Sequence, residues 1–245
     1  MILELDIGNT RLKWRRLDAG GVRIDGGFGP HLPGPGEHYP WRDPERGAPE
    51  RARIVSVAGE DFNAALLREL EAEGTRHVEF ARSGVACGRL RSGYREPERM
   101  GADRWLAMIA ASEVCDGAFA VVDAGSAITL DLVADDGGHL GGWIVPGLRM
   151  MRSALLEGTA GIRLPNTESV SLSAPGRDTA EAVGFGTVLM AQDFVARRLQ
   201  AFREEHPDAL LFVTGGDGER IAATTAEPRR HVPELVLDGL ARALG

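Results

Sequence analysis

The sequence predicts an α/β protein made of two related halves. Short β-like runs alternate with helix-like runs along the chain. In addition, an apolar strand followed by Asp, any residue, Gly and a small polar residue occurs twice, at 3–10 and at 120–127. A duplicated half-domain accounts for both observations. The alternative is two unrelated turns that share Asp and Gly because tight turns favour them.

Length and composition agree with this organisation. The chain has 245 residues and domains usually have about 100–150, so we expect one half at 1–115 and the other at 116–245. With 43% hydrophobic and 26% charged residues the chain has the composition of a globular protein. It is therefore expected to bury a sizeable core.

In the first half we expect strands at 2–6, 10–17, 53–57 and 77–81. A helix with Ala64, Leu67 and Leu70 or their neighbours on its apolar face follows the third strand. A second helix begins near Pro97 or Arg99, and its buried side carries Trp105, Leu106, Met108 and Ile109.

The segment Gly26–Glu50 interrupts this pattern with six glycines and six prolines. Such a density excludes a helix and a central strand, so we expect a long surface loop. A linker between domains is the alternative, because long loops without structure are uncommon.

The second half is expected to repeat the plan of the first. We predict strands at 119–123, 127–133, 139–145 and 210–214, and helices at 148–157 and 178–202. A short helix and the apolar segment Val232–Leu237 close the chain.

The charge and the cysteines limit the possible partners and compartments. The net charge is −8 and no basic run stands out, so we expect neither nucleic acid nor an anionic membrane as a partner. Cys87 and Cys115 are the only cysteines, and the first residues do not resemble a secretion signal. We therefore expect a cytoplasmic protein without a disulfide framework.

The first acidic turn, Asp6-Ile-Gly8-Asn9-Thr10, has the composition of a phosphate-binding turn. A glycine two residues after a strand-ending Asp lets the backbone turn sharply and present its amides. Asp6 would then hold a hydrated divalent cation that bridges the phosphates. Lys13 is the only lysine of the chain, and it would reach back over the turn to a phosphate, unless it is an ordinary exposed lysine.

A second cluster comprises Tyr94 and the segment Gly101-Ala102-Asp103-Arg104. An acid in the first turn of a helix is favoured by the helix dipole, and this alone accounts for Asp103. It does not account for Arg104, whose positive charge is disfavoured there. A base for a hydroxyl proton beside a guanidinium that binds a carboxylate accounts for both residues.

Other familiar motifs are missing from the sequence. It contains no dinucleotide or P-loop signature, no Gly-x-Ser-x-Gly, and its six histidines lack the spacing of a zinc site.

Taken together, the motifs resemble those of the type III pantothenate kinases, which belong to the superfamily of actin, heat-shock ATPases and sugar kinases. The resemblance runs from Met1 to the end of the chain. The motifs that carry it are Asp6-x-Gly8-Asn9-Thr10-x-x-Lys13, Gly101-x-Asp103-Arg104, Asp123-x-Gly125-Ser126-Ala127, Gly141-Gly142 through Pro146-Gly147, Thr179-Ala-Glu-Ala and Thr214-Gly-Gly-Asp217.

The resemblance implies two ribonuclease-H-like halves with the active-site cleft between them. It also implies phosphorylation of the primary hydroxyl of pantothenate by ATP with Mg²⁺, the first step of coenzyme A synthesis. Residues of the first motif, Asp6, Gly8, Asn9, Thr10 and Lys13, would surround the ATP phosphates, with Asp6 nearest the metal.

For the acceptor, the resemblance implies that Tyr94, Gly101, Ala102, Asp103 and Arg104 hold pantothenate, with Asp103 as base. Asp123 would bind a monovalent cation, K⁺ or NH₄⁺, and Ser126, where the family usually has threonine, would contact the nucleotide. Thr179 would reach the substrate of the other subunit of a homodimer. Another phosphotransferase of the superfamily and a non-catalytic transcriptional accessory factor remain the alternatives.

Overall fold

The computed structural model describes residues 1–30, 39–43, 45–158 and 174–245. These residues form two compact units, one made of 1–114 with 234–245 and the other of 115–233. The expected halves, 1–115 and 116–245, were continuous in sequence. In the structure the chain returns to the first unit for its last segment, because the C-terminal helix packs there.

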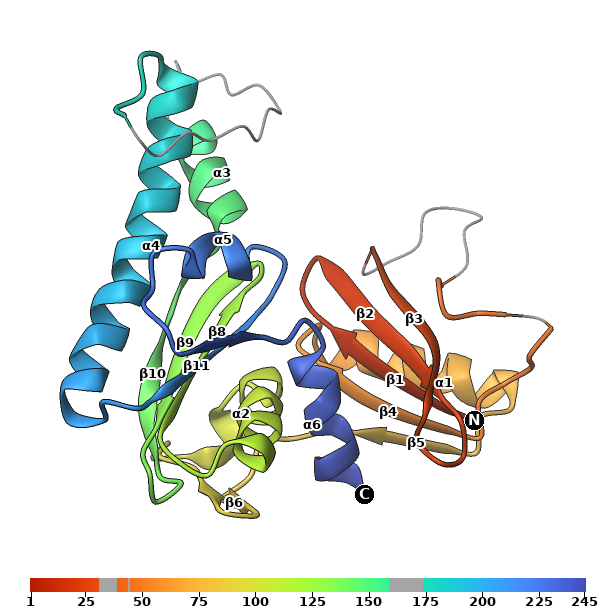
Figure 1. The fold of residues 1–245 in the computed structure, drawn as a ribbon. Helices are drawn as coiled ribbons and strands as arrows, with labels where there is room; N and C mark the ends of the chain where they lie inside the picture. Colours follow the sequence, from red (N-terminus) through yellow and green to blue (C-terminus); the bar gives the residue numbers. More distant parts are fainter. Residues whose placement is uncertain (31–38, 44, 159–173) are drawn as a thin grey trace. The chain divides into compact units, whose positions relative to one another are not determined.

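The first unit is built on a five-stranded sheet with the order β3-β2-β1-β4-β5 (Figure 1). β1 and β2 form an antiparallel hairpin, β3 continues it at the edge, and β4 and β5 run parallel to β1. The strands are β1 Ile2–Ile7, β2 Arg11–Leu17, β3 Arg23–Pro30, β4 Arg51–Ser56 and β5 His77–Phe80.

The second unit repeats this sheet with the order β10-β9-β8-β11-β12. β8, β9 and β10 form the antiparallel part, and β11 and β12 run parallel to β8. The strands are β8 Phe119–Ala124, β9 Ala127–Val133, β10 His139–Pro146, β11 Leu210–Thr214 and β12 Arg229–His231. The predicted α/β fold with two similar halves is thus confirmed.

The helices complete the two units. In the first unit they are α1 Glu60–Glu73, α2 Ala102–Val114 and α6 Leu235–Leu244, with a short 3₁₀ turn at Pro97–Arg99 and a small hairpin of β6 Ala86–Cys87 and β7 Leu90–Arg91. In the second unit they are α3 Leu148–Gly158, α4 Thr179–Glu205 and α5 Gly218–Ala222. In the described part of the chain, no helix is both long and apolar enough to cross a membrane.

Each sheet buries an apolar face against helices on one side. In the first unit Leu5 and Ile54 pack with Leu66 and Leu70 of α1. In the second unit the corresponding face of β8, β9 and β11 packs against α3, α4 and α5. Strand side chains alternate between faces, so Asp6 and Asp123 lie on the opposite face of their sheets.

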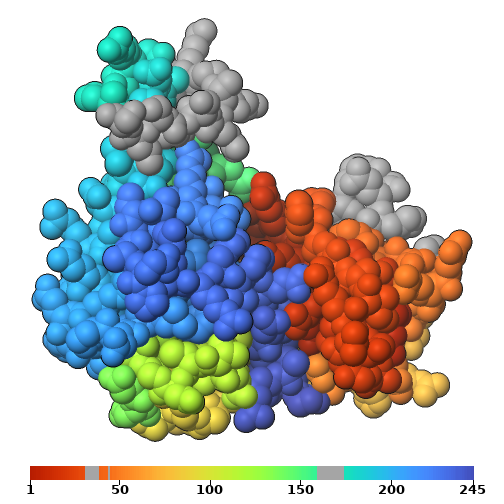
Figure 2. Space-filling view, viewed as in Figure 1, coloured from red at the N-terminus to blue at the C-terminus, as the bar shows by residue number. Residues whose placement is uncertain are grey.

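Two local predictions were wrong in their bounds. The segment expected as a loop from residue 26 contributes residues 26–30 to β3, an edge strand on which a final proline is tolerated. Figure 2 shows the N-terminal strands of the first unit in red, and β3 is the exposed edge strand among them. α2 begins only at Ala102, since Pro97–Arg99 forms a separate 3₁₀ turn. The apolar segment 232–237 contains the last two residues of the second unit, then Glu234 and the first three residues of α6.

Candidate active site

The first acidic turn joins β1 to β2. The Gly8 amide donates to the carbonyl of Arg11 at 3.0 Å, which closes the turn, and Asn9 and Thr10 are exposed at its tip. Asp6 lies directly opposite Lys13 in the antiparallel register. Opposite residues of such a pair share a face, so the carboxylate and the ammonium stand side by side next to the turn.

The second acidic turn has the same form but is shorter by one residue. The Gly125 amide donates to Ala127, two residues on, at 2.9 Å, whereas Gly8 bonds three residues on. Asp123, at the end of β8, lies opposite Thr129. Ser126 is half-buried in the turn. The turn places the Asp123 carboxylate and the Ser126 hydroxyl within one short segment.

Two glycines allow other backbone segments to pack against this second turn. A Cβ on Gly147 would lie 2.4 Å from the carbonyl oxygens of Gly125 and Ser126. A Cβ on Gly215, where φ is +85°, would lie 2.5 Å from the backbone of Ala124. The motifs around Pro146-Gly147 and Thr214-Gly215 therefore support the turn. The sequence motifs included Gly147 and Gly215, but they did not show which backbone segments pack against these glycines.

The second cluster, from Tyr94 to Arg104, forms around the start of α2. Arg104 is buried, with 6% exposure, and its Nη1 donates to the Tyr94 hydroxyl at 2.6 Å. The guanidinium also lies 5.5 Å from the centre of the Tyr94 ring. A buried arginine held by a tyrosine is a preorganised site for a planar anion such as a carboxylate.

Asp103 lies in the first turn of α2, as predicted, next to Arg104. Its Oδ1 accepts from the Arg104 amide at 2.8 Å. The Gly101 carbonyl accepts the first bond of the helix from Trp105 at 3.1 Å, and Ala102 is the first helical residue. A Cβ on Gly101 would lie 2.6 Å from Asp103 Oδ1, so a glycine is needed for this carboxylate position.

Thr179 is the first residue of α4, in the second unit. Asp178 caps the helix by accepting from the Glu181 amide at 2.8 Å. Thr179 is exposed at the edge of a groove of about 880 Å³ between α3 and α4. Met151, Leu155 and Met190 are among the apolar side chains that line this groove.

The predicted residues thus gather in separate places. Asp6, Lys13, Tyr94 and Asp103 belong to the first unit, whereas Asp123, Ser126 and Thr179 belong to the second. Within the ranges that the structure describes, no group of three His, Cys, Asp or Glu side chains forms a closed metal site. Mg²⁺ needs no such group, since it is held by one or two carboxylates, waters and substrate phosphates. Asp6 fits this role.

Comparison with known proteins gives the family. The model of the family described as "Type III pantothenate kinase" matches residues 2–201. The chain belongs to this family. A curated type III pantothenate kinase from Pseudomonas paraeruginosa is 41% identical over 249 residues, covering 99% of this chain and 98% of that protein. Another from Azotobacter vinelandii is 39% identical over 251 residues, with the same coverage.

Solved structures show the same fold at low identity. A putative Baf family transcriptional activator from Campylobacter jejuni aligns with a TM-score of 0.57 and 20% identity, over 99% of this chain and 96% of that one. A putative 2-dehydro-3-deoxygalactonokinase from Sinorhizobium meliloti aligns with a TM-score of 0.57 and 13% identity, over 99% and 98%. Both likenesses concern the fold alone.

Proposed function

We propose that the protein transfers the γ-phosphoryl group of ATP to the primary hydroxyl of pantothenate. The observation that carries this proposal is the buried Arg104, held by Tyr94 beside the carboxylate of Asp103. Pantothenate has a carboxylate for the guanidinium and a hydroxyl for the base. The family to which the chain belongs supports the same reaction.

In this proposal the turn at 6–13 binds the triphosphate. The backbone amides of the turn and the Lys13 ammonium face the phosphates, and Asp6 holds the hydrated Mg²⁺. When bound, Mg²⁺ neutralises charge on the phosphate oxygens. Phosphoryl transfer passes through a loose transition state, so these residues act by alignment and charge neutralisation.

In the acceptor site Arg104 fixes pantothenate through its carboxylate, and Asp103 accepts the proton of the primary hydroxyl. The hydroxyl oxygen forms the new bond to the γ-phosphorus as the bond to the bridging oxygen breaks. The products are 4′-phosphopantothenate and ADP. A positioned base of this kind contributes about 10²–10⁴-fold to the rate.

The direct test is to incubate the purified protein with ATP, Mg²⁺, K⁺ and pantothenate and to identify the product by mass spectrometry. We expect 4′-phosphopantothenate and one ADP per product. Phosphorylation of a different alcohol but not of pantothenate would indicate another phosphotransferase. ATP binding without transfer to any acceptor would favour the non-catalytic alternative. We also propose that the protein acts in the cytoplasm, because the proposed reaction consumes ATP.

We further propose that Asp123 binds a monovalent cation. A second carboxylate facing the triphosphate would repel it, by roughly 4 kcal/mol for two charges about 4 Å apart at an effective dielectric constant near 20. A cation between the two groups removes this repulsion. Asp123 and Ser126 supply oxygen atoms that can coordinate K⁺ or accept hydrogen bonds from NH₄⁺.

Activity is therefore expected to depend on K⁺ or NH₄⁺ through Asp123. The measurement is the initial rate in sodium or Tris salts at constant ionic strength, before and after adding K⁺, for the natural protein and for Asp123→Ala. We expect K⁺ to stimulate the natural protein strongly and Asp123→Ala little. Full activity without K⁺ or NH₄⁺ would exclude the cation, and strong stimulation of Asp123→Ala would place it elsewhere.

We also propose a homodimer in which Thr179 contributes to the site of the partner subunit. The apolar groove beside Thr179 supports this assembly. Met190 is 57% exposed and Leu155 39%, and burying apolar side chains of this kind stabilises protein interfaces. A two-fold dimer would bury the same surface of both subunits.

A mixed dimer tests the role of Thr179. Thr179→Arg and Asp103→Asn are each expected to be nearly inactive. After subunit exchange, one site of each mixed dimer would combine an intact Thr179 with an intact Asp103, so activity should return. The initial rate measures this, and mass spectrometry of the intact dimer verifies the exchange. An exchanged but inactive mixture would assign Thr179 to its own subunit or to no site.

A further inference from the structure

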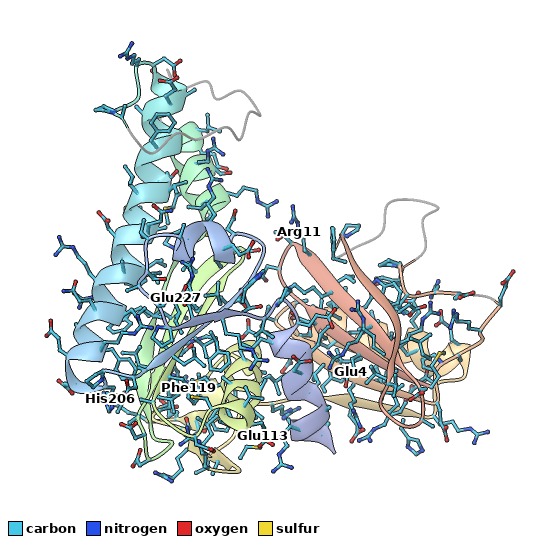
Figure 3. The ribbon with its side chains drawn as sticks, in the orientation of Figure 1. Glu4, Arg11, Glu113, Phe119, His206 and Glu227 are labelled. Atoms are coloured by element: carbon cyan, nitrogen blue, oxygen red, sulfur yellow. The ribbon has the colours of Figure 1, made fainter. Side chains whose placement is uncertain are left out.

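A network of charged side chains lies next to the first acidic turn, on the same face of the sheet as Asp6. Its centre is Glu4 of β1, whose side chain is fully buried. Arg15 of β2 donates from Nε to Glu4 Oε2 at 2.6 Å, and Arg53 of β4 donates from Nη1 to Glu4 Oε1 at 3.1 Å. Figure 3 shows Glu4 inside the first unit, beside α6.

Arg15 extends this network to α6. Its Nη1 donates to Asp238 at 2.6 Å and to Glu234 at 3.3 Å. Arg23 of β3 pairs with Glu234 at 3.0 Å. Glu4, Glu234 and Asp238 thus balance the three arginines. Glu234 directly precedes α6 and Asp238 lies in its first turn, where the helix dipole favours negative charge.

Burial of Arg15 lowers its pKa, but the hydrogen bond to Asp238 and the charge of Glu4 outweigh burial. The pKa of Arg15 therefore lies above its ordinary value. Arg15 stays charged at every pH at which the protein would be assayed, and it is 8% exposed. Without it, Glu4 would keep only Arg53 among these partners.

The Glu4–Arg15 pair of the network lies next to the first acidic turn, on the two strands that the turn joins. In the register of β1 and β2, Glu4 lies opposite Arg15 and Asp6 lies opposite Lys13. The two opposite pairs are two residues apart along the strands. All four side chains therefore share one face. The chain leaves the second unit at Pro233 and re-enters the first at Glu234, which is the residue that Arg15 and Arg23 bind.

We propose that Arg15 is a positioning residue for phosphoryl transfer, because it ties Glu4 to α6 and so fixes the strands that carry Asp6 and Lys13. The inference rests on the proposed function. Phosphoryl transfer depends on alignment, and a misplacement of about 1 Å can cost about 10²-fold in rate. An ion pair with a structural role alone would change stability and leave the rate of the folded protein unchanged.

The test uses the fact that Lys13 is the only lysine of the chain. Protein labelled with ¹⁵N- and ¹³C-lysine gives one lysine signal set, which reports the surroundings of Lys13 with and without Mg-ATP. The same proteins are assayed for kcat and KM. The set comprises the natural protein, Arg15→Met, Arg15→Lys and, as a control, Arg242→Gln. Arg242 lies on α6, as Asp238 does, and makes an exposed ion pair with Glu113 of α2.

We expect Arg15→Met to lower kcat by about 10–100-fold, to change KM for ATP by less than about threefold, and to alter the response of Lys13 to Mg-ATP. Arg15→Lys should recover part of kcat, and Arg242→Gln should match the natural protein. If Arg15→Met does not fold, Asp238→Ala replaces it, since the Asp238 side chain is 45% exposed and its removal leaves the Glu4 pairs intact.

An unchanged kcat and an unchanged Lys13 response, with only a lower Tm, would overturn the positioning role. Failure of the proposed function would give a different result from failure of the positioning role. The Lys13 signal of the natural protein would shift with Mg-ATP, but the natural protein would not phosphorylate pantothenate. The comparison of Lys13 between the natural protein and the Arg15 variants then still decides the role of Arg15.

Discussion

Asp103→Asn is expected to lower kcat by at least about 10²-fold while the fold and ATP binding are kept. The asparagine has nearly the same shape and can still accept from the Arg104 amide, as Asp103 does at 2.8 Å. It cannot take up the hydroxyl proton of the acceptor. The substitution therefore slows the transfer step, which is measured as kcat. The Kd for Mg-ATP is measured as well and should not change.

A matched control separates this role from the helix dipole. Asp61 is also an acid in the first turn of a helix, α1, and it is exposed. Asp61→Asn should cost a few tenths of a kcal/mol in stability, about the dipole contribution of an exposed acid, and leave kcat unchanged. Equal turnover of Asp103→Asn and the natural protein would remove Asp103 from the mechanism.

Gly239→Ala is expected to destabilise the first unit by about 2 kcal/mol. A Cβ on Gly239 would lie 2.2 Å from the carbonyl oxygen of Leu106, in the contact between α6 and α2. The obstacle is backbone, so no change of rotamer relieves it. Alanine gains about 1 kcal/mol of helix propensity over glycine, which offsets part of the cost. Thermal unfolding should show Tm lower by about 4–8 °C.

Gly184→Ala is the control for this second prediction. Gly184 is also buried within a helix, α4, but the nearest atom to its added Cβ is Arg152 Nη2, at an ordinary 3.6 Å. The same substitution should therefore raise stability by up to about 1 kcal/mol. Similar Tm changes for both variants would show that α6 does not pack closely on α2.

The sequence by itself determined the elements whose signal is local. The alternation of β1 and β2 already places Asp6 and Lys13 on one face, and the glycine after Asp6 marks the turn. The two acidic turns also indicated the duplication, which the matching order of the two sheets bears out. The catalytic and binding roles assigned to these residues stay predictions until the assays are done.

Only the tertiary structure decided which distant segments meet. The edge strand β3 forms in a glycine-rich segment because β2 offers it a pairing partner, a gain that local propensity does not contain. α6 returns to the first unit because its apolar side chains and Gly239 fit α2, and because Arg15 binds its first turn. Arg104 is buried where its guanidinium donates to the hydroxyl of Tyr94, ten residues earlier in the chain. Burial, close backbone approach and ion pairing depend on residues far apart in the chain, so periodicity and spacing cannot reveal them.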